Sequence, residues 1–184
     1  MITAADATRA GIHSQHLTRL VAEGALERVA RGNYRFAARP VTEHHGLVVA
    51  ARTAPQGVIC LLSALAFHEI GTQLPPEVWV AIDRRARAPR RAQPPLRVVR
   101  FSGAAFTEGI EVHRIEGTPV RVYSVAKTLA DLFKHRGNVG MDVALEALRE
   151  AWRGRRFTMD ALDRAARVCR VERVMRPYVE AVVS

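Results

Sequence analysis

Residues 11–36 read GIHSQHLTRLVAEGALERVARGNYRF, and this stretch decides the fold of the first part of the chain. The residues up to Ser14 are typical of a tight turn, with Ser14 as the N-cap of the helix that follows. Leu17, Leu20 and Val21 then recur at helical spacing until a glycine ends the pattern. The stretch therefore predicts a helix with one apolar stripe, followed by a segment of different character.

A shorter helix is expected just before this turn. Thr3 and Asp6 have the spacing of a capping box, with Asp in place of the usual Glu, and Gly11 ends the helix. A short helix, a tight turn and a second helix predict a helix-turn-helix.

A hairpin is expected after the second helix. Residues 26–29 and 34–36 are of strand type, and Gly32 and Asn33 between them tolerate the positive φ of a hairpin turn. A hairpin in this position predicts the wing of a winged helix-turn-helix.

The helix and the hairpin supply the candidate DNA contacts. Gln and Arg side chains on the outer helix face can pair with adenine and guanine edges, and arginines on a wing meet backbone phosphates. A solvated helix face and an ordinary exposed hairpin are the alternatives. The predicted DNA-binding residues are Ser14, Gln15, His16, Thr18, Arg19, Arg28, Arg31, Asn33 and Arg35.

The charge of the chain agrees with an anionic partner. The 184 residues carry a net charge of +10, which attracts nucleic acid or an anionic membrane surface. Residues 84–91 are rich in arginine and are followed by Pro94 and Pro95, which predicts an exposed loop. This loop is either a solubilising tract or a second phosphate contact. Its candidate residues are Arg84, Arg85, Arg87, Arg90 and Arg91.

The rest of the chain predicts an α+β body. Thr42 can cap a helix that ends near Pro55, residues 59–70 read as a buried helix, and helices follow Ser124, with the last starting or kinking near Pro177. Four strands are expected, at residues 78–82, 96–101, 110–115 and 120–123, the last two as a hairpin. The predicted fold class is α+β: an N-terminal winged helix-turn-helix, then a small, mostly antiparallel sheet and a C-terminal helical bundle.

Other features argue against several classes of protein. No apolar run is long enough for a membrane helix and no signal sequence follows Met1, so a cytoplasmic protein is expected. Cys60 and Cys169 are expected to be buried thiols rather than a disulfide. Lys127 and Asp131 have the spacing of a common helical ion pair, and the sequence has no Gly-rich phosphate loop or serine elbow, so we expect no enzyme.

No metal or cofactor is expected either. His44 and His45 are adjacent in the sequence, so on a helix they point in different directions and do not grip one metal ion.

Several segments together resemble one family, the AbiEi-type antitoxins and transcriptional regulators of type IV toxin–antitoxin systems. Residues 10–34 look like its winged module, with an Arg-Gly-x-Tyr wing. Its C-terminal domain is similar to residues 124–131, 140–148 and 176–178. The resemblance implies a winged module at residues 1–40 and an AbiEi-like domain at residues 41–184. Winged modules normally begin with one more helix, so the first helix is expected to be missing, or the body to cover the face it would leave exposed.

The resemblance also implies a function. An antitoxin of this type binds double-stranded DNA at inverted repeats upstream of its own operon, represses it, and counters a nucleotidyltransferase toxin without necessarily binding that toxin. A free-standing regulator, and a protein–protein module that docks on a toxin through its basic surface, are the alternatives.

Overall fold

The computed structural model describes residues 1–37, 42–89 and 93–183. They form two compact units: Met1–His45 together with Arg114–Thr118, and Gly46–His113 together with Pro119–Ser184. The predicted domain end at residue 40 lies outside the described residues.

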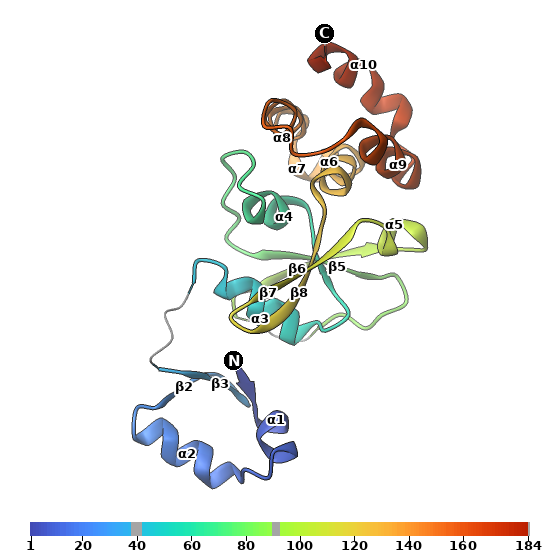
Figure 1. Ribbon diagram of the computed structural model, residues 1–184. Helices are drawn as coiled ribbons and strands as arrows, with labels where there is room; N and C mark the ends of the chain where they lie inside the picture. Colours follow the sequence, from blue (N-terminus) through green and yellow to red (C-terminus); the bar gives the residue numbers. More distant parts are fainter. Residues whose placement is uncertain (38–41, 90–92, 184) are drawn as a thin grey trace. The chain divides into compact units, whose positions relative to one another are not determined.

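The described part of the first unit contains two helices and a small antiparallel sheet, seen in Figure 1. Its described elements are β1 (Ile2–Thr3), α1 (Ala4–Arg9), α2 (Ser14–Ala22), β2 (Leu26–Ala30) and β3 (Asn33–Phe36). The strands follow the order β1-β3-β2, and both pairings are antiparallel. The predicted order of helix, turn, helix and hairpin is therefore present, and the short strand β1 was not predicted.

The helix starts follow from local hydrogen bonds. The hydroxyl of Thr3 accepts the N–H of Asp6 at 3.0 Å, and the Asp6 carboxylate accepts the N–H of Thr3 at 2.9 Å, so the predicted capping box is confirmed. The N-cap of α2 is His13, which makes no side-chain cap bond, and not Ser14 as predicted. Ser14 is the first residue of α2, and its carbonyl also accepts the hydroxyl of Thr18 at 3.2 Å.

A small apolar core holds this unit together. Leu17 of α2 packs with Ala7 of α1 and Leu26 of β2, all three at most 3% exposed. Around them lie the partly buried residues Ile2, Ala4, Leu20, Val21 and Tyr34. Of these, Leu20 and Val21 are the other two residues of the predicted stripe. The apolar stripe of α2 therefore faces the core as expected, which turns its polar side chains outwards.

The second unit holds most of the larger sheet and the remaining helices. The strands are β4 (Val58–Ile59), β5 (Val78–Asp83), β6 (Leu96–Phe101), β7 (Ile110–Ile115) and β8 (Thr118–Tyr123). The helices are α3 (His45–Thr53), α4 (Leu61–Phe67), α5 (Ala104–Thr107), α6 (Val125–Lys134), α7 (Arg136–Val139), α8 (Met141–Arg153), α9 (Met159–Cys169) and α10 (Glu172–Val183). The α+β class and the helical C-terminal part are as predicted.

The larger sheet is mixed, whereas a mostly antiparallel sheet was predicted. Its order in the described residues is β6-β5-β4-β8-β7, with β5 and β6 parallel, β4 and β8 parallel, and β4 and β5 antiparallel. The long connection between β5 and β6 permits a parallel pair, which a tight turn does not. The short strand β4 was missed because its two residues precede α4 in one continuous apolar run.

The helices of the second unit bury its core. Figure 1 shows α4 and α6 on one side of the sheet and α3 on the other, with α8, α9 and α10 beyond α6. Leu129, Leu132 and Phe133 of α6 are fully buried between these layers. Ser124 caps α6 as predicted, by accepting the N–H of Lys127. Pro177 does not start the last helix, which already begins at Glu172.

The segment before α3 is held by Glu116. One carboxylate oxygen accepts the N–H and the hydroxyl of Thr42 at 3.2 and 3.1 Å, and the other lies 2.9 Å from Nδ1 of His45. Burial raises the pKa of Glu116, but the hydrogen bonds from His45 and Thr42 outweigh it and leave the pKa lowered. Thr42 therefore bonds across to Glu116 with its hydroxyl, and α3 begins at His45.

Candidate nucleic-acid interface

The outer face of α2 is a polar surface on a helix whose other face is core. Gln15, His16, Thr18 and Arg19 are exposed, and Leu17 between them is 3% exposed. Ser14 is exposed in the first turn. The structure thus brings the predicted helix residues to one exposed surface, where polar side chains can reach base edges or phosphates.

Arg19 has an ion-pair partner that was not predicted. Its Nε donates to Oε1 of Glu23 at 2.7 Å, and both side chains are largely exposed, at 73% and 49%. The i, i+4 spacing was the available signal for this pair. The pair uses only Nε, so the two Nη groups of Arg19 remain available to donate to a base edge.

The β2–β3 hairpin turns at Arg31 and Gly32. Gly32 has φ of +78°, which the turn requires, and its carbonyl accepts the N–H of Ala4 at 2.8 Å. The pairing shifts register between Arg28 and Ala30. The tip of the hairpin is therefore attached to the start of α1 rather than free.

The arginines of the hairpin differ in their surroundings. Arg28 and Arg31 are exposed and have no ion-pair partner among the described residues. Arg35 lies opposite Glu27 in the ladder and forms an ion pair with it, with Nε 2.9 Å from Oε2 and a side chain only 22% exposed. Asn33 is half-buried and pairs with Thr3 of β1. Arg28 and Arg31 are therefore the two that can meet a phosphate without losing a carboxylate.

The candidate secondary contacts lie in the connection after β5. Arg84, Arg85 and Arg87 are exposed there, whereas Arg90 and Arg91 lie outside the described residues.

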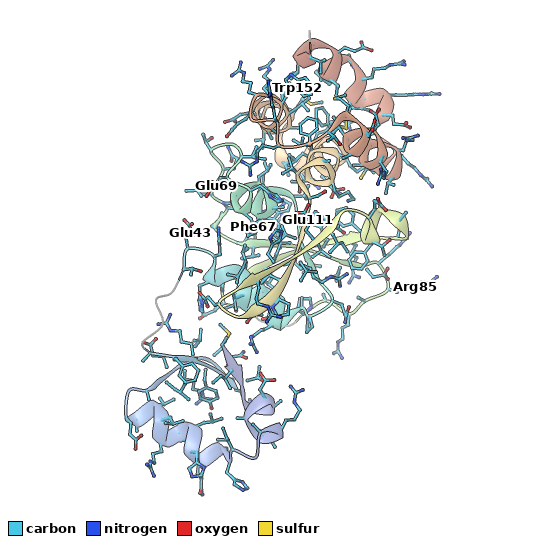
Figure 2. All side chains as sticks on the ribbon, viewed as in Figure 1. Glu43, Phe67, Glu69, Arg85, Glu111 and Trp152 are labelled. Carbon is cyan, nitrogen blue, oxygen red and sulfur yellow. The ribbon has the colours of Figure 1, made fainter. Side chains whose placement is uncertain are left out.

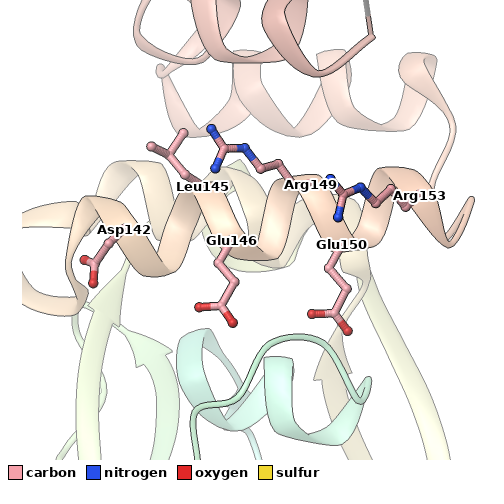
Figure 3. Close-up of a pocket in the computed structure, with 6 residues that line it drawn as sticks. All are labelled: Asp142, Leu145, Glu146, Arg149, Glu150 and Arg153. Atoms are coloured by element: carbon pink, nitrogen blue, oxygen red, sulfur yellow. The ribbon is translucent and has the colours of Figure 1, made fainter.

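A separate pocket of about 490 Å³ lies along α8. Figure 3 shows the carboxylates of Asp142, Glu146 and Glu150 on one side of this helix and the side chains of Arg149 and Arg153 on the other side. Glu150 accepts the N–H of Gly71 at 2.7 Å, and Glu146 accepts the hydroxyl of Thr72 at 3.4 Å. These two carboxylates thus fasten the segment after α4 to α8.

The other ionisable or nucleophilic side chains considered as catalytic residues are buried in the core. Lys127 and Asp131 are buried, so a substrate in solvent does not reach them. Cys60 and Cys169 are buried free thiols, as predicted, and burial raises the pKa of both. Within the described ranges, no three histidine, cysteine or carboxylate side chains are grouped as metal ligands. None of the described helices is long and apolar enough to cross a membrane.

The comparison with known families gives a match within the first unit. Residues 1–37 match the model of a family described as transcriptional regulator, AbiEi antitoxin. The resemblance inferred from the sequence is thereby confirmed over this N-terminal segment. The matched family is a regulatory class rather than an enzyme class.

The fold also has a likeness among solved structures. The crystal structure of the RV2827C protein from Mycobacterium tuberculosis matches 98% of this chain and 74% of that chain, with a TM-score of 0.60 and 14% identity. At this identity the likeness shows a common fold. No curated protein matches the chain.

Proposed function

We propose that this protein is a DNA-binding transcriptional repressor and that residues 1–37 form a winged helix-turn-helix. The observation that carries the proposal is the exposed face of α2, with Gln15, His16, Thr18 and Arg19 outside and Leu17 in the core. It belongs to the segment that matches the regulator family.

In this proposal α2 enters the major groove. Arg19 can donate two hydrogen bonds to a guanine edge and Gln15 can pair with adenine, so these side chains supply sequence preference. Arg28 and Arg31 contact flanking phosphates, which adds affinity without reading sequence. Inverted repeats then place two copies on two half-sites about one helical turn, or a multiple of it, apart.

The biological setting follows from the family resemblance. The protein acts in the cytoplasm as the antitoxin of a type IV toxin–antitoxin system, represses its own operon and counters a nucleotidyltransferase toxin. A free-standing regulator would bind its operator in the same way, and the neighbouring gene distinguishes the two. A protein–protein module would instead bind DNA without sequence preference.

A titration at two salt concentrations tests the repressor. The full chain is mixed with labelled duplexes of its own upstream region and of a scrambled sequence, beside Arg19→Ala. Arg9→Ala is the control, because Arg9 lies on α1 and pairs with Asp6. We expect a preference of about a hundredfold or more for the upstream duplex, lost in Arg19→Ala and kept in the control. Equal, weak binding to both duplexes would overturn the proposal.

A further inference from the structure

We infer that the turn after β5 is a second DNA contact, which binds backbone phosphates without reading sequence. The inference rests on the proposed function for the identity of the ligand. Arg84, Arg85 and Arg87 are exposed and have no ion-pair partner among the described residues. Figure 2 shows Arg85 at the outside of the connection between β5 and β6.

The turn is built by its own hydrogen bonds. The N–H of Arg84 donates to the carbonyl of Phe101 at 2.7 Å, and the N–H of Ala86 donates to the carbonyl of Asp83 at 2.9 Å. The N–H of Arg85 donates to the Asp83 carboxylate at 2.8 Å. The backbone of Arg84 and Arg85 is therefore attached to the ends of β6 and β5, and Arg87 follows one residue after Ala86, which is bonded in the same way. The Asp83 carboxylate accepts a backbone N–H.

Arg100 of β6 forms hydrogen bonds with the backbone of this turn. Its Nη1 donates to the carbonyls of Arg84 and Ala86, both at 2.9 Å. Arg97 is used differently: it pairs with Glu77 at 3.2 Å and stacks on the ring of Trp79, 4.1 Å from the centroid. Arg100 is thus a positioning residue, and the exposed arginines of the turn are the ones available to a ligand.

The composition of the turn favours a phosphate backbone over a protein partner. Protein interfaces centre on buried aromatic and aliphatic side chains. The described residues beside the arginines are Ala86, Ala88 and Pro89, so the turn offers no large apolar anchor. Guanidinium groups bind phosphate oxygens with paired, charge-assisted hydrogen bonds. Several guanidinium groups on one turn whose backbone is held by hydrogen bonds can therefore bind successive phosphates of a nucleic-acid strand.

The salt dependence of DNA binding tests this contact. The triple variant Arg84→Gln, Arg85→Gln, Arg87→Gln is compared with the wild-type chain on long upstream and scrambled duplexes. A matched control carries the same charge change at Arg149, Arg153 and Arg164, which are exposed on α8 and α9. Circular dichroism melts verify that all three proteins fold alike.

The contact predicts a change of slope. Each phosphate contact contributes about −0.9 to the slope of log K against log salt, so the triple variant should lose about 2 to 3 of that slope on both duplexes. Its sequence preference should stay that of the wild type, and the control should keep its slope.

The outcomes separate this inference from the proposed function. An unchanged slope in the triple variant, or an equal loss in the control, would overturn the second contact and direct the search to an acidic protein surface. A wild-type chain without sequence preference, but with the expected slope difference, would overturn only the sequence-specific repressor.

Discussion

The Nζ atom of Lys127 lies 2.6 Å from both carboxylate oxygens of Asp131, and the two side chains are 1% and 0% exposed. The ring of Tyr123 lies 4.1 Å from the same Nζ, and the thiol of Cys169 donates to Asp131 at 3.2 Å. A charge pair in the core persists because each partner satisfies the other. The pair is therefore part of the framework of the second unit.

Lys127→Met should destabilise the protein by about 3–5 kcal/mol, because it leaves a buried carboxylate without its counter-charge. Urea unfolding followed by circular dichroism measures this loss. Lys134→Met on the exposed side of the same helix is the control, with an expected change of about 0.5 kcal/mol or less. Similar small losses in both variants would contradict the role of the pair.

The stability should also depend on pH through Asp131. Burial is the largest influence on this carboxyl and raises its pKa to about 6, against the opposing effects of Lys127 and Cys169. Between about pH 4, where an unfolded Asp ionises, and pH 6, the folded protein keeps a proton that the unfolded chain has lost. The stabilisation that Asp131 protonation gives to the folded protein is therefore complete below about pH 4, and it is lost as the pH rises through 6.

The difference in unfolding free energy between wild type and Asp131→Asn isolates this contribution. Measured at several pH values from 4 to 7, the wild-type stability relative to the variant should fall with rising pH. A difference that rises or stays constant over that range would show that Asp131 does not titrate in this way.

Glu23→Gln should strengthen DNA binding. In the proposed function α2 enters the major groove, so this change takes a negative charge away from the phosphates and releases Nε of Arg19 from an exposed ion pair worth about 0.2–1 kcal/mol. We expect an affinity gain of up to about fivefold for the upstream duplex, measured by fluorescence anisotropy. Glu43→Gln, a carboxylate outside α2, controls for the change of net charge. Weaker binding by Glu23→Gln would mean that the pair positions Arg19 in the complex.

If residues 1–37 bind DNA as proposed, Arg31→Ala should weaken binding to all duplexes alike and reduce the salt slope by about 1, because the exposed guanidinium then loses a phosphate contact. Arg35→Ala is the informative comparison, since Arg35 already pairs with Glu27. Arg35→Ala should reduce the salt slope by less than Arg31→Ala does. Anisotropy titrations at several salt concentrations give both slopes. A loss confined to the upstream duplex in Arg31→Ala would instead indicate that this residue reads bases.

Thr3→Ala should destabilise α1 by about 1 kcal/mol, because the N-cap hydroxyl bonds the N–H of Asp6. Amide hydrogen exchange at Asp6 in the full chain reports this loss locally. Thr8→Ala on the same helix is the control, with little expected change because its hydroxyl only bonds back to the Ala4 carbonyl. Equal exchange at Asp6 in both variants would show that the cap contributes nothing.

Several features of the chain could be predicted from short stretches of sequence. The capping box of Thr3 and Asp6, the stripe of α2 that begins at Leu17, and the hairpin turn at Gly32 depend on residues a few positions apart. Two of the four strands have their predicted bounds, 96–101 and 110–115. Alternating or continuous apolar runs and local caps carry this information before the chain folds.

The pairing of strands was a matter of tertiary structure. Nothing in residues 78–83 or 96–101 states that the two strands run parallel, because the connection between them is long enough for either direction. The strand at Val58 and Ile59 exists because β5 and β8 lie on its two sides.

The sequence by itself determined where the arginines are and which segments are helix, hairpin or loop. Only the tertiary structure decided which arginines are available to a ligand. Arg35 meets Glu27 across the hairpin, and Arg100 meets carbonyls on the far side of the β5–β6 connection. The physical reason is that ion pairs and hydrogen bonds depend on distance in space, which chain folding sets for residues far apart in sequence.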